Sequence, residues 1–91
     1  MKKAVKLTID GTVQSMFFRQ FVKEHADKYN VKGFIRTLES GKIEIFVEGN
    51  PDAVDPMVAI CKRGPKYANI RSVQEKEERF QDFKEFKIMR I

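Results

Sequence analysis

A short segment near the N-terminus combines residue types that can bind an anion. Residues 11–19 read Gly-Thr-Val-Gln-Ser-Met-Phe-Phe-Arg. They follow an alternating apolar pattern typical of a strand and lead into a spacing typical of a helix. A loop that enters a helix presents backbone N–H groups without helical partners, and an arginine adds a planar, permanently charged donor. Residues 11–19 therefore predict a binding site for a phosphate-like or carboxylate anion.

Apolar spacing and turn residues predict the elements that position this loop. In chain order they are a strand over 3–10, a helix over 19–29, strands over 33–38 and 42–48 joined by a hairpin at 39–41, a helix over 51–63, a strand over 70–78 and a last strand over 83–91. This order, β-α-β-β-α-β plus a terminal strand, is typical of a ferredoxin-like α+β sandwich. We therefore expect a single domain, residues 1–91, with two helices on one face of an antiparallel sheet.

The same patterns predict which side chains are buried. The residues expected in the core of the third strand and the second helix are Ile43, Ile45, Val47, Val54, Met57, Val58 and Cys61. In that strand, Glu44 and Glu48 alternate with the apolar residues and should face water. At the start of the first helix, Phe17 and Phe18 should pack against the core rather than stack on nucleic-acid bases.

The charge of the chain is compatible with nucleic acid and with small anionic ligands, and by itself it does not separate the two. Its 18 Lys and Arg residues exceed its 13 Asp and Glu residues, for a net charge of +5, but the basic residues are scattered along the chain. Scattered basic residues are typical of a solvated surface, and they also attract small anions toward a binding loop. Nucleic-acid binding stays an alternative that a strong, salt-dependent affinity for oligonucleotides would support.

Two further features concern the cellular environment. Cys61 is the single cysteine, so an intrachain disulfide cannot form, and this fits a reducing compartment. Lys6 and Asp10 interrupt the apolar residues at the N-terminus, so the sequence predicts neither a signal peptide nor a membrane-spanning segment. We expect a cytoplasmic protein.

Two stretches of the chain resemble the signatures of a known family. Gly11, Val13 and Gln14, followed by Phe18 and Arg19, look like the first signature of the acylphosphatase family. The stretches Lys-Gly-Phe-Ile-Arg at 32–36 and Gly-Lys-Ile-Glu at 41–44 resemble its second signature. The resemblance covers essentially the whole chain. It implies hydrolysis of the carboxyl-phosphate bond of small acyl phosphates, without a metal ion or a cofactor.

The resemblance also implies roles for particular residues. The phosphoryl group would bind to backbone N–H groups of the first signature, with Arg19 holding its oxygens. The substrate-binding residues that the resemblance implies are Gln14, Ser15, Met16, Phe17, Phe18 and Arg19. In the family's second signature an asparagine orients the attacking water, and Thr37 occupies that position here. The candidate catalytic residues are therefore Arg19 and Thr37.

Two departures from the family pattern predict a weakened enzyme. A threonine hydroxyl can hold a water molecule, but it is shorter than an amide and lacks the amide's planar geometry. Losing one well-placed polar contact to a transition state typically lowers the rate by a factor on the order of 10²–10³. The other departure is Ser15, which stands where the family has glycine, and a serine strains the loop if this position requires a positive φ.

The departures leave two alternatives for function. One is a hydrolase of small acyl phosphates, and the other is a non-catalytic module of the same fold that binds phosphate, another anion or a protein partner. In both cases the expected ligand is a small acyl phosphate or inorganic phosphate. We expect a monomer without a membrane partner.

Overall fold

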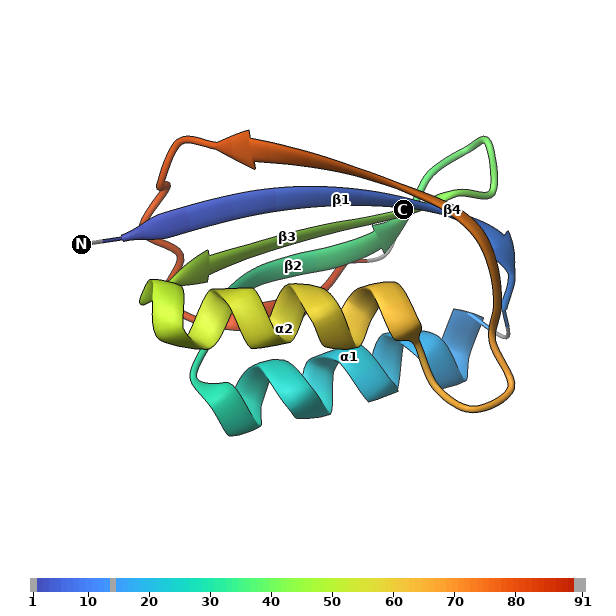
Figure 1. Cartoon of the computed structure of the whole chain (residues 1–91), viewed down its shortest axis with the longest axis horizontal. Coiled ribbons are helices and arrows are strands. Elements are labelled where there is room, and N and C mark those ends of the chain that lie inside the picture. The colour runs from blue at the N-terminus through green and yellow to red at the C-terminus, as the bar shows by residue number, and fades with distance from the viewer. Residues whose placement is uncertain (1, 14, 90–91) are drawn as a thin grey trace.

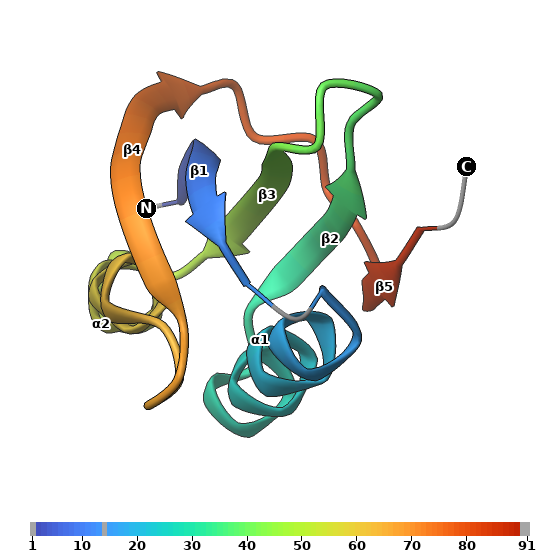
Figure 2. The same cartoon turned by 90° about the vertical axis from the view of Figure 1, so that its right-hand side faces the viewer.

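The structure is a computed structural model that describes residues 2–13 and 15–89 of the chain. Within these residues it contains two helices and five strands. They are β1 (Lys3–Thr12), α1 (Ser15–Tyr29), β2 (Lys32–Thr37), β3 (Ile43–Gly49), α2 (Pro51–Arg63), β4 (Asn69–Glu78) and β5 (Phe86–Ile88). Both helices cover the same face of the sheet (Figures 1 and 2). Neither helix, within the part of the chain that is described, is long and apolar enough to cross a membrane.

The described strands form one sheet in the order β4-β1-β3-β2-β5. The pairs β1–β3, β1–β4 and β2–β3 are antiparallel, whereas β5 runs parallel to β2. Ile35 is opposite Ile88 in this parallel pair, and the backbone N–H of Met89 donates to the carbonyl oxygen of Ile35 at 2.9 Å. The predicted ferredoxin-like α+β sandwich is thus confirmed, and its last strand makes the sheet mixed rather than wholly antiparallel.

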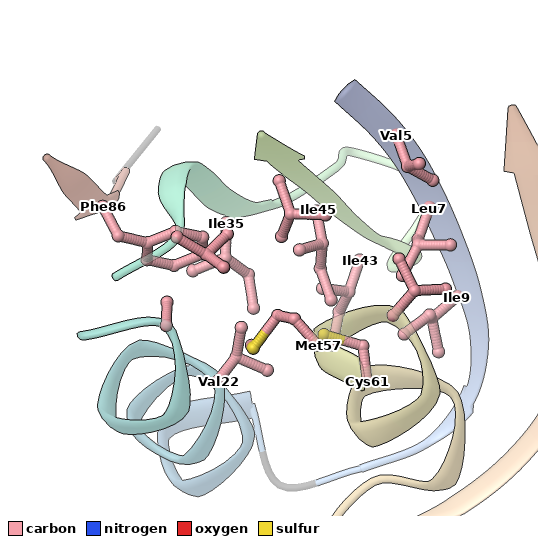
Figure 3. Packing of buried hydrophobic residues seen from close by; sticks show 14 of the residues in the cluster. Val5, Leu7, Ile9, Val22, Ile35, Ile43, Ile45, Met57, Cys61 and Phe86 are labelled. Carbon is pink, nitrogen blue, oxygen red and sulfur yellow. The ribbon is translucent and has the colours of Figure 1, made fainter. Parts of the chain in front are cut away.

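The hydrophobic core lies between the helices and the sheet (Figure 3). Alternate side chains of each strand point toward the helices, and one apolar stripe of each helix points back toward the strands. The core residues labelled in Figure 3 are Val5, Leu7, Ile9, Val22, Ile35, Ile43, Ile45, Met57, Cys61 and Phe86. The core that the sequence predicts for β3 and α2 is confirmed, since all seven of its residues are buried.

The ends of two elements differ from their predicted positions. α1 begins at Ser15 rather than at residue 19. Residues 15–18 contain no glycine or proline, and Phe18 lies on the same helical stripe as Val22, so the helix extends into the predicted loop. β5 covers only Phe86–Ile88 rather than 83–91, and residues 90 and 91 lie outside the described part of the chain.

A segment between β4 and β5, residues 79–85, crosses the face of the sheet opposite the helices (Figure 2). The ring of Phe83 lies 5.7 Å from that of Phe34 and 5.5 Å from that of Phe46, between ring centroids. This crossing segment carries the chain from one edge of the sheet to the other. It explains why β5 can run parallel to β2.

The structure contradicts the prediction that Glu44 and Glu48 face water. Glu48 is fully buried, and its carboxylate accepts hydrogen bonds from the backbone N–H groups of Gln81 at 2.7 Å and Phe83 at 2.5 Å. Glu44 is also buried, and it pairs with Arg36 on the neighbouring strand at 2.7 Å. Both carboxylates point away from the helices as predicted by alternation. Their face of the sheet, however, is covered rather than solvated.

Candidate anion-binding site

The ends of three elements lie toward the same end of the molecule. β1 ends there at Thr12, α1 begins there at Ser15, and β2 ends there at Thr37 (Figure 1). The register of the sheet connects them, because Ile9 near the end of β1 pairs with Ile43 of β3, and Ile43 pairs in turn with Thr37. The two stretches that resemble family signatures therefore lie at the same end of the molecule.

The connection from β1 to α1 is the predicted anion-binding loop. It consists of residues 13 and 14 between the last residue of β1 and Ser15, the first residue of α1. The first backbone N–H groups of a helix lack helical acceptors and carry the positive end of the helix dipole. The first turn, Ser-Met-Phe-Phe, contains no acidic residue that would repel an anion. Gln14, one of the predicted binding residues, lies outside the described residues.

Gly11 explains how closely β1 approaches the start of β4. The pairing of these strands shifts register between Asp10 and Gly11, which marks a β-bulge. A Cβ atom at Gly11 would overlap the carbonyl oxygen of Asn69 and lie 2.8 Å from the Cα of Ile70. The glycine therefore permits a close backbone contact immediately before the loop. The sequence marked Gly11 as part of a signature, but it could not reveal this contact.

Arg19 lies inside α1, one turn after Ser15, and its side chain is half-buried. Helical side chains tilt toward the helix N-terminus, so a long side chain at this position extends back toward the first turn. A guanidinium group is a planar, charged hydrogen-bond donor suited to an anion. The placement of Arg19 agrees with the role that the sequence predicts, and that role stays a prediction.

Thr37 is the last residue of β2 and is half-buried. Side chains alternate along a strand, so Thr37 shares its face with Ile35, which points into the core beneath the helices. Its hydroxyl is thus on the helix side of the sheet, at the end where α1 begins. Its role in holding a water molecule for a ligand at the loop stays a prediction.

The three apolar residues of the first turn of α1 have different surroundings. Phe18 is 1% exposed and belongs to the core, as predicted, but Met16 and Phe17 are 73% and 68% exposed. The prediction that Phe17 packs against the core is therefore wrong. Phe18 shares the fully buried row of α1 with Val22 and Ala26, whereas Phe17 lies about 100° away, on a row whose next member, Phe21, is only partly buried.

A pocket of about 470 Å³, which residue spacing does not predict, adjoins the loop. It is lined by Val13, Phe17, Phe18, Pro65, Tyr67 and Ala68. Its walls come from the start of α1 and from the connection between α2 and β4. The fold brings the turn after α2 next to the loop, although these segments are far apart in the sequence.

Other side chains with reactive chemistry are engaged elsewhere. Cys61 is fully buried in α2, and burial raises the pKa of its thiol to about 12, which disfavours the nucleophilic thiolate. The ring nitrogen Nδ1 of His25 lies 2.8 Å from the carbonyl oxygen of Phe21, one turn earlier in α1. Among the described residues, no three His, Cys, Asp or Glu side chains gather as a metal ion would require.

Comparison with known proteins identifies the family. The family model named Acylphosphatase matches residues 5–88. The chain belongs to the acylphosphatase family. An acylphosphatase of Rubrobacter xylanophilus is 38% identical over 76 residues, which cover 84% of this chain and 69% of that protein. An acylphosphatase structure from Bacillus subtilis superposes with a TM-score of 0.87 at 29% identity, over 98% of this chain and 99% of its own. An acylphosphatase structure from Coxiella burnetii also superposes with a TM-score of 0.87, at 25% identity, over 97% of this chain and 93% of its own.

The acylphosphatase family accounts for the arrangement of the two signature-like stretches. Proteins of this family are hydrolases that act on acyl phosphates. In this member, the first stretch forms the end of β1 and the start of α1, and the second forms β2 and the start of β3. The family and the fold are thus shown, and the consequences of Ser15 and Thr37 stay predictions.

Proposed function

We propose that this protein hydrolyses the carboxyl-phosphate bond of small acyl phosphates. One observation carries the proposal: the first turn of α1, with Arg19 one turn behind it, shares an end of the molecule with Thr37 of β2. Membership of the acylphosphatase family supports it. In this proposal the start of α1 binds the phosphoryl group, Arg19 holds its oxygens, and Thr37 holds the attacking water.

The proposed chemistry needs positioning and charge stabilisation more than it needs an acid or a base. Water attacks phosphorus, the bond from phosphorus to the carboxyl oxygen breaks, and the acyl group leaves as a carboxylate. A carboxylate is a stable leaving group, and a phosphoryl oxygen can take the proton of the water. Backbone N–H groups and the Arg19 guanidinium then stabilise the negative charge on the phosphoryl oxygens. This scheme uses no metal ion, and we propose that the protein works without one.

Benzoyl phosphate hydrolysis by the native chain and two variants tests the proposal. We expect slow native turnover, and a fall on the order of 10²–10³ in Arg19→Ala, because the variant removes charge stabilisation from the transition state. Thr37→Asn should increase the rate, by up to a similar factor, because a planar amide holds the water in a fixed direction. Native turnover that survives in Arg19→Ala would disprove the binding role of this residue. A Thr37→Asn rate no higher than native would contradict the role given to position 37.

The presence of Thr37 also favours a second candidate, a module that binds anions without hydrolysing them. Such a module binds inorganic phosphate, detected by calorimetry or by shifted amide signals at the start of α1, and shows no turnover of benzoyl phosphate. Robust native turnover eliminates this candidate. For the hydrolase as for the module, we propose a cytoplasmic monomer.

A further inference from the structure

We propose that the pocket beside the loop binds the acyl group of the substrate and selects apolar, aromatic-sized acyl groups. This inference rests on the proposed function, because it concerns the part of an acyl phosphate that lies beyond the phosphoryl group. We name this pocket the acyl pocket and define it by its lining residues, Val13, Phe17, Phe18, Pro65, Tyr67 and Ala68.

The chemistry of the acyl pocket suits an apolar group. Every lining residue is apolar or aromatic, and the Tyr67 hydroxyl is the one polar side-chain group among them. Its volume of about 470 Å³ lies within the range of pockets that hold small organic ligands, roughly 300–1,000 Å³. A charged acyl group would lose hydration there without gaining a partner from these side chains.

The base of the acyl pocket is part of the packed core. Phe18 is buried, and Val13 and Ala68 pack against the core cluster. The backbone N–H of Ala68 donates to the carbonyl oxygen of Pro65 at 3.0 Å, which closes the turn that forms the opposite wall. A Cβ at Gly64 would lie 3.4 Å from a ring carbon of Phe18, so this turn and α1 pack closely. The pocket is therefore largely preformed.

The rim of the acyl pocket is formed by two exposed aromatic side chains. Phe17 is 68% exposed and Tyr67 is 89% exposed, although aromatic side chains are usually buried to a large extent. They come from segments far apart in the sequence and line the same cavity. Two aromatic rings at the mouth of an apolar pocket can close on a planar ligand group.

The sheet order places the acyl pocket and Thr37 on opposite sides of the loop. β1 has β4 as one neighbour and β3 as the other, and β2 lies beyond β3. Thr12 at the end of β1 pairs with Asn69, the residue after Ala68 in the pocket wall. On the other side, Ile43 of β3 separates β1 from Thr37. Figure 2 shows the end of β2 and the α2–β4 connection on either side of the end of β1.

The placement of Thr37 and the acyl pocket on opposite sides of the loop matches the geometry of phosphoryl transfer. The attacking and leaving oxygens lie roughly in line, on opposite sides of phosphorus. A water held at Thr37 therefore directs the leaving acyl oxygen away from β2, toward the acyl pocket. The side chains of Phe17 and Tyr67 determine specificity in this arrangement, because they contact the acyl group and not the reacting atoms.

The test compares two stable analogues in which a methylene replaces the bridging oxygen. Phenacylphosphonate carries a benzoyl group and acetonylphosphonate carries an acetyl group. We expect the native protein to bind phenacylphosphonate about 10-fold more tightly or better by calorimetry, because apolar contacts of this size contribute on that order. Tyr67→Ala should reduce the ratio of the two affinities, with the affinity for acetonylphosphonate unchanged. Phe17→Ala should also reduce this ratio.

A matched control is Phe80→Ala. Phe80 is an aromatic residue of the crossing segment, two residues after the end of β4 at Glu78. Glu78 pairs with Ala4, at the end of β1 that is far from the loop, so Phe80 serves as an aromatic control away from the acyl pocket. This variant should keep the native ratio. The proposal that the acyl pocket binds the acyl group would be overturned if the native protein bound the two analogues equally. A preference for phenacylphosphonate that survives in both pocket variants would also overturn it. So would the failure of both analogues to bind.

The same experiment separates this inference from the proposed hydrolysis. A native preference for phenacylphosphonate that Tyr67→Ala removes supports the acyl pocket even if the native protein does not turn over benzoyl phosphate. In that case only the proposed hydrolysis fails. Turnover of benzoyl phosphate without any preference between the analogues keeps the hydrolysis and overturns the acyl pocket.

Discussion

Arg19 and Thr37 contribute to the proposed reaction in different ways. Arg19 carries a permanent charge on a long side chain, so its contribution tolerates small changes in position. Thr37 must direct one water molecule along one line through phosphorus, and a hydroxyl that rotates about its C–O bond fixes that direction less well than an amide. Substitutions at Thr37 should therefore change kcat more than affinity for phosphate. Arg19→Ala should weaken both.

At the same scale, Gly11 should be intolerant of a side chain. Gly11→Ala should lower the free energy of unfolding by about 1–3 kcal/mol, because the added Cβ overlaps the backbone of β4. Urea unfolding measures the loss. Thr12→Ala, at the exposed neighbouring position, is the control and should change stability by less than about 0.5 kcal/mol. Equal stabilities of Gly11→Ala and the native chain would show that β1 and β4 can separate there without cost.

At the scale of the elements, the segment over 79–85 joins β4 to β5 across the outer face of the sheet. It holds its place through the aromatic contacts of Phe83 with Phe34 and Phe46, and through hydrogen bonds to the Glu48 carboxylate. This segment delivers β5 to the edge of β2. The pairing of β5 with β2 supports the strand that ends at Thr37.

Glu48→Gln should loosen this crossing segment. An amide has one carbonyl oxygen for two backbone donors, and its NH₂ group would face one of them, so a buried N–H loses its acceptor. The expected cost is about 1–3 kcal/mol, measured by urea unfolding, with faster hydrogen exchange at the amides of Gln81 and Phe83. Glu44→Gln is the control, because its partner Arg36 is partly exposed, and it should cost at most about 1 kcal/mol. The interpretation fails if both variants exchange these amides at the native rate.

At the scale of the whole molecule, folding buries a single thiol in the core. Burial raises the pKa of Cys61 from 9.0 to about 12. Below pH 9 the thiol keeps its proton in the folded and unfolded states alike. As the pH rises from 9 toward 12, the unfolded chain releases this proton while the folded chain retains it, so the free energy of unfolding decreases.

This linkage predicts a loss of stability in alkaline solution. Urea unfolding at pH 8 and pH 10 should show a lower free energy of unfolding at pH 10. In Cys61→Ala the cavity lowers the free energy of unfolding at both pH 8 and pH 10. The difference in this free energy between the two pH values should be smaller than in the native chain, because the titrating thiol is absent. A thiol reagent should also modify Cys61 only in urea. An identical pH dependence in the variant would show that other groups cause the decline.

Local periodicity determined much of this protein before its fold was known. The strand and helix order and the apolar stripe of α2 follow from residue spacing. These features depend on neighbours in the chain, which a sequence displays directly. The predicted loop and Thr37 share one end of the molecule for a different reason: β1 and β2 both pair antiparallel with β3 and therefore run in the same direction.

The tertiary structure alone decided which surfaces are covered. Alternation predicts that Glu48 points away from the helices, but it does not reveal that residues 79–85 cross over it. Likewise, helical spacing does not reveal that Phe17 stays exposed beside Tyr67, on the rim of a pocket. Burial depends on contacts between segments that are distant in the chain. Local spacing therefore determined the elements and the loop, and long-range packing decided what lies next to them.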